Sequence, residues 1–170
     1  KSNVGLIVAG STAGMGIAYG DAEGDAVTEP FDAVIFATPA RVTGSIIEAI
    51  APDASALLAQ AETADVIMVT AHVPADEWPA RLHGMSGYLV PKPMQRLVTA
   101  VSFGSQKWLH WEHAGLVMLR ISLGRDGLPV LHLSDEQLLA AAIEEVGHHL
   151  GLAVQPEHAR VSRWPGAFPQ

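Results

Sequence analysis

Residues 134–151, with the sequence SDEQLLAAAIEEVGHHLG, constrain the fold more strongly than any other stretch of the chain. Ser134 and Gln137 have the spacing of a capping box, and the two acidic residues between them favour the positive end of a helix dipole. Apolar residues recur at helical spacing, namely Leu138, Leu139, Ala142, Ile143, Val146 and Leu150. Gly151 stands where a left-handed C-terminal cap is common. The segment therefore predicts a helix over 135–150 with one buried side.

Strand patterns surround this helix. We predict strands at 65–73, 87–90, 96–103 and 115–124, and a last strand at 158–164. Alternation places Leu97, Thr99, Val101 and Phe103 on one face of the strand at 96–103, and Leu116, Met118, Arg120 and Ser122 on one face of the strand at 115–124. Short connections between successive strands favour antiparallel pairing. The predicted fold class is α+β, a mostly antiparallel sheet with packed helices.

The first third of the chain has a different pattern. The predicted elements are a hairpin formed by 4–9 and 15–20, a strand at 31–37, a helix that contains Thr43, Ile46, Ile47 and Ile50, and a short helix at 53–61. Thr38 can cap the first of these helices, with Pro39 at its first position. Pro52 is expected to end it.

Composition excludes several functions. The chain has 170 residues, a net charge of −8 and no cysteine. The acidic charge argues against a nucleic-acid partner, and no apolar run reaches the roughly 20 residues of a membrane helix. Without cysteine there is no disulfide and no thiolate metal site, which fits a reducing cytoplasm. We therefore expect a cytoplasmic protein without membrane insertion.

Charge is unevenly distributed along the chain. The stretch 78–125 contains one carboxylate, Glu112, and six basic residues: Arg81, Lys92, Arg96, Lys107, Arg120 and Arg125. Such a basic middle suits a small ligand that carries carboxylates. An ordinary solvated surface is the alternative that composition leaves open.

Other catalytic motifs fail on physical grounds. The glycine-rich stretch 8–16 and the Tyr88-x-x-x-Lys92 spacing are similar to motifs of short-chain dehydrogenases, but prolines at 91 and 93 break the helix that such a pair needs. His148 and His149 are adjacent on the predicted helix and diverge by about 100°, so they cannot chelate one metal. No Gly-x-Ser-x-Gly elbow indicates a hydrolase. We predict no metal site.

Six stretches in a fixed order carry a family resemblance. They are FDAVIFATPA at 31–40, GYLVP at 87–91, a strand at 99–108 that ends in QKW, LRISLGR at 119–125, LSDEQL at 133–138 and RWPGAFPQ at 163–170. Together, over residues 28–170, they resemble the FAD-dependent porphyrinogen oxidases of haem biosynthesis, within the monoamine-oxidase-like flavoprotein superfamily. The glycine-rich stretch 8–16 then becomes a hairpin turn.

The resemblance implies an enzyme that removes six electrons from a porphyrinogen in three flavin-mediated steps, with oxygen as acceptor. Coproporphyrinogen III is the first substrate expected and protoporphyrinogen IX the second. Other enzymes of the haem pathway are candidate partners. The competing interpretation is a non-enzymatic domain that binds a tetrapyrrole or a partner protein.

The family opens with a Gly-x-Gly-x-x-Gly strand-turn-helix and closes with a Gly-Asp segment followed by a helix that touches the isoalloxazine, and we match neither to this sequence. We therefore interpret the chain as an internal fragment that retains no FAD and is inactive alone. The expected division is a remnant of the FAD-binding domain at 1–40, a substrate-binding domain at 41–163 and a return segment at 164–170.

Candidate site residues follow from the resemblance. Val8, Ala37, Thr38 and Pro39 are the expected cofactor-binding residues. Leu89, Ser102 and Ser122 match positions that face the substrate in the family. Arg120 shares the predicted strand face of Ser122, so it is the expected partner of a propionate. No catalytic side chain is predicted, because the flavin supplies the redox chemistry.

Overall fold

The computed structural model describes residues 7–11, 14–19, 27–31, 33–112 and 115–169. The chain forms two compact units, which we call unit 1 (up to Glu62) and unit 2 (Thr63–Phe168). They divide at 62/63, whereas the sequence placed domain boundaries at 40/41 and 163/164. The predicted functional roles of those domains remain predictions.

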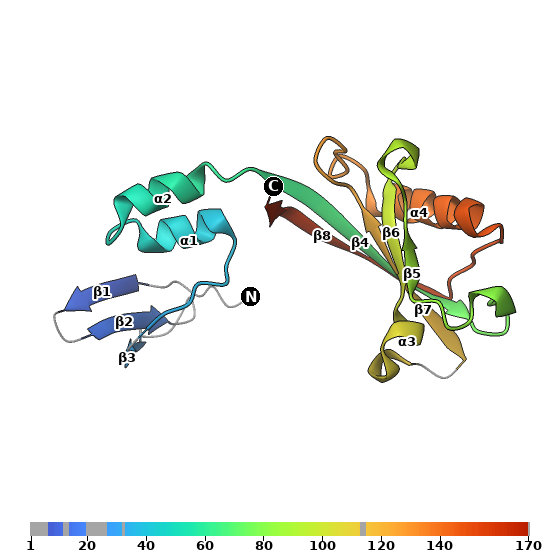
Figure 1. The fold of residues 1–170 in the computed structure, drawn as a ribbon, viewed down its shortest axis with the longest axis horizontal. Coiled ribbons are helices and arrows are strands. Elements are labelled where there is room, and N and C mark those ends of the chain that lie inside the picture. Colours follow the sequence, from blue (N-terminus) through green and yellow to red (C-terminus); the bar gives the residue numbers. More distant parts are fainter. Residues whose placement is uncertain (1–6, 12–13, 20–26, 32, 113–114, 170) are drawn as a thin grey trace. The chain divides into compact units, whose positions relative to one another are not determined.

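Unit 1 contains a three-stranded antiparallel sheet and two short helices (Figure 1). Its strands are β1 (Ile7–Ser11), β2 (Gly14–Tyr19) and β3 (Val27–Phe31), and its helices are α1 (Ala40–Ile47) and α2 (Pro52–Ala59). A hairpin was predicted from 4–9 and 15–20, and β1 and β2 do form one, with Ser11 paired to Gly14 across the turn; residues 4–6 and 20 lie outside the described ranges. The glycine-rich stretch therefore joins two strands and does not lead into a helix.

Two details of the unit 1 prediction were wrong. The strand expected at 31–37 is absent over 33–37, where the backbone pairs with no described strand and Ile35 is 93% exposed. An apolar run becomes a strand only where a neighbouring strand accepts its hydrogen bonds. Helix α1 begins at Ala40 with Pro39 as the N-cap, and the Thr38 hydroxyl bonds the Thr43 hydroxyl at 2.7 Å instead of capping the backbone.

Unit 2 is a five-stranded sheet in the order β5-β6-β7-β4-β8, with antiparallel neighbours. Its strands are β4 (Thr63–Pro74), β5 (Gly87–Leu89), β6 (Val98–Phe103), β7 (Leu116–Leu123) and β8 (His158–Pro169). Its helical elements are α3 (Gly104–Lys107), α4 (Asp135–Leu150) and the single turns η1 (Ala80–Leu82), η2 (Lys92–Met94) and η3 (Leu109–Trp111). The α+β prediction is confirmed.

Helix α4 has the bounds that its sequence predicts. Ser134 and Gln137 form both hydrogen bonds of the capping box, and Gly151 adopts the left-handed conformation at the other end. Arg163 of β8 donates to Asp135 Oδ1 at 2.8 Å and so ties the last strand to the start of this helix. The hydrogen bonds that Glu136 accepts from its own backbone N–H and from Ser134 lower the pKa of its carboxyl group. Anionic groups are favoured at this helix end.

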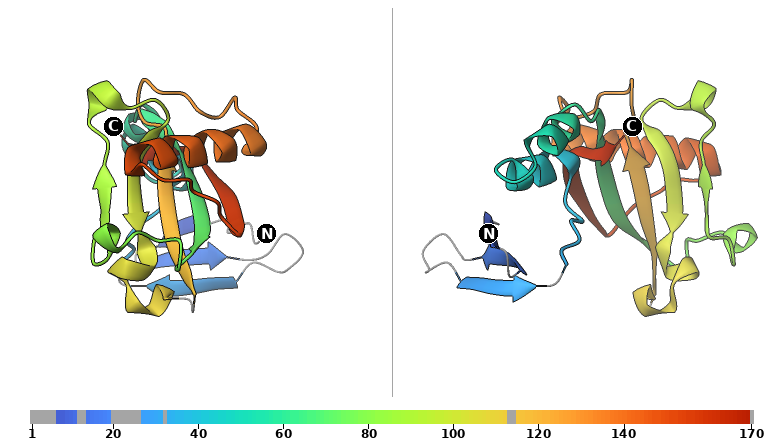
Figure 2. Two further views of the ribbon diagram at one scale, coloured as in Figure 1. Left: turned by 90° about the vertical axis from the view of Figure 1, so that its right-hand side faces the viewer. Right: turned by 60° about the vertical axis from the view of Figure 1, so that its left-hand side comes forward.

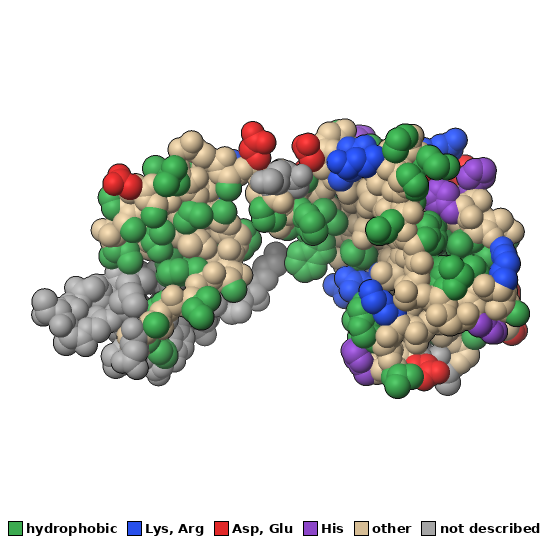
Figure 3. Space-filling view, viewed as in Figure 1, with side chains coloured by type: hydrophobic (Ala, Val, Ile, Leu, Met, Phe, Trp, Pro, Cys, Tyr) green, Lys and Arg blue, Asp and Glu red, His purple; other side chains and the backbone are tan. Residues whose placement is uncertain are grey.

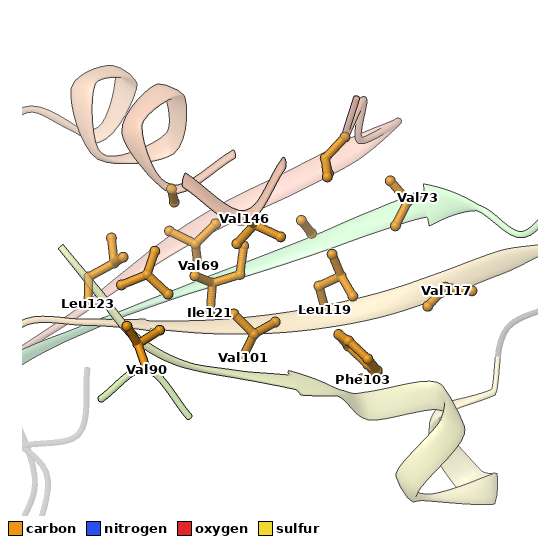
Figure 4. Close-up of a cluster of buried hydrophobic side chains, with 14 of the residues drawn as sticks. Val69, Val73, Val90, Val101, Phe103, Val117, Leu119, Ile121, Leu123 and Val146 are labelled. Carbon is orange, nitrogen blue, oxygen red and sulfur yellow. The ribbon is translucent and has the colours of Figure 1, made fainter. Parts of the chain in front are cut away.

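Helix α4 and the sheet form two layers with the core between them (Figure 2). Alternate residues of β4 and β7 point into this layer, among them Ile67, Val69, Leu119 and Ile121, and each of these is fully buried. Val146 reaches them from α4, as Figure 4 shows. Burial of each such side chain contributes about 1.5–3 kcal/mol relative to exposure.

The alternation predicted for the strand at 96–103, with Leu97, Thr99, Val101 and Phe103 on one face, was wrong at its start. Pairing with β7 shifts register between Val98 and Ala100, which makes Thr99 an extra residue in a β-bulge. A bulge moves the following side chains to the opposite face. The buried set is consequently Val98, Val101 and Phe103, while Thr99 is only half-buried.

Candidate functional site

The face of the sheet opposite α4, here called the open face, carries side chains that are not part of the hydrophobic core. The register aligns them in rows across β5, β6, β7 and β4. One row consists of Leu89, Ala100, Ser122 and Met68, and the next consists of Gly87, Ser102, Arg120 and Thr70. The strands of unit 2 thus present a continuous, mostly small or apolar surface.

All four predicted substrate-binding residues lie on the open face. Ser102 pairs with Arg120, and Leu89 lies in the same row as Ser122. Leu89 is 80% exposed, so it does not belong to the core. Gly87 allows this close pairing, because its φ of +135° would be strained for other residues and a Cβ would lie 2.1 Å from the Val101 carbonyl oxygen. Their role in substrate binding remains a prediction.

Two hollows indent the open face and meet at Met68. The first, which we call the Trp111 hollow, has a volume of about 370 Å³ and is lined by Met68, Thr70, Trp111, Met118, Arg120, Ser162 and Trp164. The second, which we call the Arg125 hollow, has a volume of about 540 Å³. Its lining includes Val66, Met68, Lys92, Thr99, Ser122, Arg125, Asp126 and Phe168.

Arg120 lies in the Trp111 hollow with its guanidinium over the Trp111 ring, 5.3 Å from the ring centroid. A cation–π contact at this distance is attractive and leaves the in-plane N–H donors available. Among the described residues no carboxylate pairs with Arg120. Gly104 makes room for this arrangement, since a Cβ there would lie 2.6 Å from Met118 and 2.9 Å from Trp111.

The basic residues of the stretch 78–125 do not all lie on the open face. Arg120, Lys92 and Arg125 line the hollows of the open face. Arg81 instead donates to the Leu150 carbonyl, Arg96 lines a groove beside α4, and Lys107 lies over the Trp108 ring. Figure 3 shows Lys and Arg side chains interspersed with apolar ones on the visible side of unit 2. The basic middle is therefore divided between the hollows of the open face and other parts of the surface.

Sequence reasoning missed several residues of the open face. Met68 and Thr70 could have been found from the alternation of β4, whose buried residues include Ile67, Val69 and Ala71. Trp164 was assigned to a return segment, but β8 extends to Pro169 and brings this side chain, 56% exposed, to the Trp111 hollow. Nothing in the local sequence indicates that contact, because it depends on pairing between distant strands.

The predicted cofactor residues lie in unit 1. Ala37, Thr38 and Pro39 are consecutive, exposed and directly precede α1. Val8 belongs to β1, and part of α1 lies close to that strand. A flavin pyrophosphate typically binds a glycine-rich turn followed by a helix N-terminus. In the described ranges the glycine-rich stretch is a β-hairpin, so it does not fit that group. The exposed turn at 37–39 is what unit 1 could offer to a flavin.

Three interacting polar side chains, those of Glu145, His149 and Tyr88, lie on the α4 side of the sheet. Glu145 of α4 is only 8% exposed, and its Oε2 accepts hydrogen bonds from the backbone N–H groups of Leu97 and Val98 at 3.1 and 3.2 Å. The His149 ring lies between this carboxylate, 3.8 Å away, and the Tyr88 hydroxyl, 3.1 Å away. Burial and then the charge of Glu145 raise the pKa of Tyr88, so its hydroxyl stays protonated and can donate to His149.

None of the helices in the described ranges is both long and apolar enough to cross a bilayer. Within the same ranges, no three His, Cys, Asp or Glu side chains gather in a way that could hold a metal ion.

Comparison with known proteins defines the class of this chain. Residues 7–170 match the family described as flavin-containing amine oxidoreductases, and the chain belongs to that family. The predicted flavoprotein resemblance is thus confirmed.

Particular relatives narrow the comparison. The coproporphyrinogen III oxidases of Mycobacterium bovis and Mycobacterium tuberculosis are 36% identical over 140 residues, which is 82% of this chain and 30% of theirs. A solved structure of a candidate protoporphyrinogen oxidase from an Exiguobacterium species shares the fold, with a TM-score of 0.67 and 22% identity over 99% of this chain and 35% of its own. The chain spans about a third of the length of the proteins it matches.

Proposed function

We propose that the open face of unit 2 binds the substrate of an FAD-dependent porphyrinogen oxidase, with coproporphyrinogen III as the substrate. The observation that carries this proposal is Arg120, a cation on an apolar sheet face without a carboxylate partner among the described residues. A porphyrinogen combines a broad apolar ring with propionates at its rim, and such a ligand needs an apolar surface with a few placed cations. The names of the mycobacterial relatives support the choice of substrate.

Each group on the open face has a separate task in this proposal. Leu89, Met68 and Trp164 provide apolar contact with the macrocycle. Ser102 and Ser122 have small side chains, so they leave room for the macrocycle to lie against the open face. Arg120 binds a propionate through two parallel N–H donors and so fixes the orientation of the ring. FAD would accept the electrons, with oxygen as the final acceptor, and this chain contributes binding and orientation.

The experiment measures porphyrin binding to the 170-residue chain, because oxidised porphyrins are stable analogues of the substrate. Trp111 and Trp164 line the Trp111 hollow, so quenching of tryptophan fluorescence reports occupancy. Arg120→Ala should weaken coproporphyrin III binding by about 1.5–3 kcal/mol, or roughly 10- to 100-fold in Kd, because a charge-assisted contact is lost. Arg120→Lys should keep only part of the wild-type affinity for coproporphyrin III. The positive charge remains, but an ammonium cannot form the planar two-bond contact.

Arg96→Ala is the matched control, because Arg96 lies in the groove beside α4. It should leave the Kd unchanged. The tetramethyl ester of coproporphyrin III should bind the wild-type chain and the Arg120→Ala variant equally. If neither porphyrin form binds, or if both arginine variants behave alike, the open face is not the substrate surface.

A second prediction concerns the cofactor. The purified chain should carry no stoichiometric FAD, because its glycine-rich stretch forms the hairpin of β1 and β2 and not a pyrophosphate-binding turn. The measurement is the visible absorption of the chain after gel filtration in the presence of FAD. A yellow protein with one flavin per chain would contradict both this prediction and the structural reason given for it.

A further inference from the structure

The Arg125 hollow contains a cation that its neighbours hold in place. The Arg125 Nε–H donates to Gln95 Oε1 at 2.6 Å, and its Nη1 donates to the Asp126 carbonyl oxygen at 2.6 Å. Gln95 is itself anchored, since its Nε2 donates to the Val90 carbonyl at 2.7 Å. Two of the three guanidinium nitrogens are thus engaged. The N–H groups of Nη2 have no acceptor among the described residues.

The backbone supports this placement. Arg125 opens a tight turn in which the Leu128 N–H donates to its carbonyl oxygen at 2.9 Å. Gly124, just before it, has a φ of +86°, and a Cβ at this position would lie 2.6 Å from Val130. The chain therefore leaves β7 in a conformation that glycine favours. This conformation fixes the position of the Arg125 backbone, from which its side chain extends. Long side chains fixed in this way lose less conformational entropy when they bind a ligand.

The surroundings of Arg125 suit the end of an amphipathic ligand. The hollow has an apolar floor that includes Val66, Met68 and Phe168, and its cations are Arg125 and Lys92. Asp126 also lines it, so the three ionised groups leave one net positive charge. Met68 is shared with the Trp111 hollow, so one apolar surface has Arg120 in one hollow and Arg125 in the next.

We propose that Arg125, positioned by Gln95, binds a second carboxylate of the same ligand and selects tetrapyrroles that carry carboxylates on all four pyrrole rings. This inference rests on the proposed function of the open face. Protoporphyrin IX carries both carboxylates on one edge of the ring, so a molecule bound through Arg120 has vinyl groups at its other edge. Coproporphyrin III has carboxylates around the whole ring. Arg125 thus discriminates between the two, whereas Arg120 contacts both.

The test measures the Kd of the 170-residue chain for coproporphyrin III and protoporphyrin IX by tryptophan quenching. Arg125→Ala should weaken coproporphyrin III binding at least about 10-fold and change protoporphyrin IX binding less than about 2-fold. Arg125→Gln keeps a polar hydrogen-bonding side chain without the charge and should show the same selective loss. Gln95→Met, which cannot accept the Nε–H bond, should give a smaller selective loss. Arg96→Ala is the control.

The outcomes separate the two proposals. Arg125 variants could weaken the binding of both porphyrins equally, or of neither, while Arg120→Ala still weakens the binding of coproporphyrin III. That result refutes the role of Arg125 and leaves the open face as the binding surface. If wild-type chain binds no porphyrin, both proposals fail. In the double variant of Arg120 and Arg125 the two fold-losses should multiply, because contacts with separate carboxylates are independent.

Discussion

Leu138→Asp should unfold unit 2, or lower its free energy of unfolding by at least about 4 kcal/mol. Leu138 is fully buried on α4, within the core that joins the helix to the sheet. The substitution removes apolar contacts and places a carboxylate in the buried core, at a position that is 0% exposed. Since a domain of this size is stable by only about 5–15 kcal/mol, such a loss is a large part of the total.

The measurement is urea denaturation followed by tryptophan fluorescence, because all four tryptophans belong to unit 2. Ala140→Asp is the matched control, since Ala140 lies on the exposed side of the same helix. It should cost about 0.5–0.7 kcal/mol, the difference in helix propensity. Leu139→Asp and Ile143→Asp should fall between the two, because both side chains are only partly buried against the core. Equal midpoints for Leu138→Asp and Ala140→Asp would mean that α4 does not cover the sheet in this way.

The sequence predicts unit 2 better than unit 1 for a physical reason. Helix α4 carries its own caps and its own apolar stripe, so local signals determine its bounds. Strand β7 alternates regularly over its whole length, and its two faces follow directly. Residues 33–37 are apolar too, but a strand needs hydrogen-bonding neighbours that no local pattern supplies. The bulge at Thr99 is equally non-local, because it depends on pairing with β7.

The candidate site was predictable in part. Alternation placed Arg120 and Ser122 on one face, and the structure confirms that they share it. Family resemblance supplied Leu89 and Ser102, which the register brings to the same face. Trp111, Trp164 and the Gln95–Arg125 hydrogen bond come from separate segments of the chain, so only the fold reveals them.

The burial of Glu145 could not be predicted from the sequence, because a glutamate in a helix ordinarily faces solvent. In the structure its Oε2 accepts hydrogen bonds from the backbone N–H groups of Leu97 and Val98, at the irregular start of β6. Glu145→Ala would leave both donors unsatisfied in a buried place. Each such donor costs about 1–3 kcal/mol, so for the two together we expect a loss of about 2–6 kcal/mol in the free energy of unfolding.

Glu144→Ala provides the control for this prediction, because Glu144 is exposed on the same turn of α4. It should change stability by no more than about 0.5 kcal/mol. Glu145→Gln keeps a carbonyl oxygen for the two N–H groups, so it should retain most of the stability that Glu145→Ala loses. Hydrogen exchange adds a local readout, since the amides of Leu97 and Val98 should exchange faster in Glu145→Ala and not in Glu144→Ala. If those two amides remain equally protected in both variants, the carboxylate does not hold the bulge, and the burial of Glu145 requires another explanation.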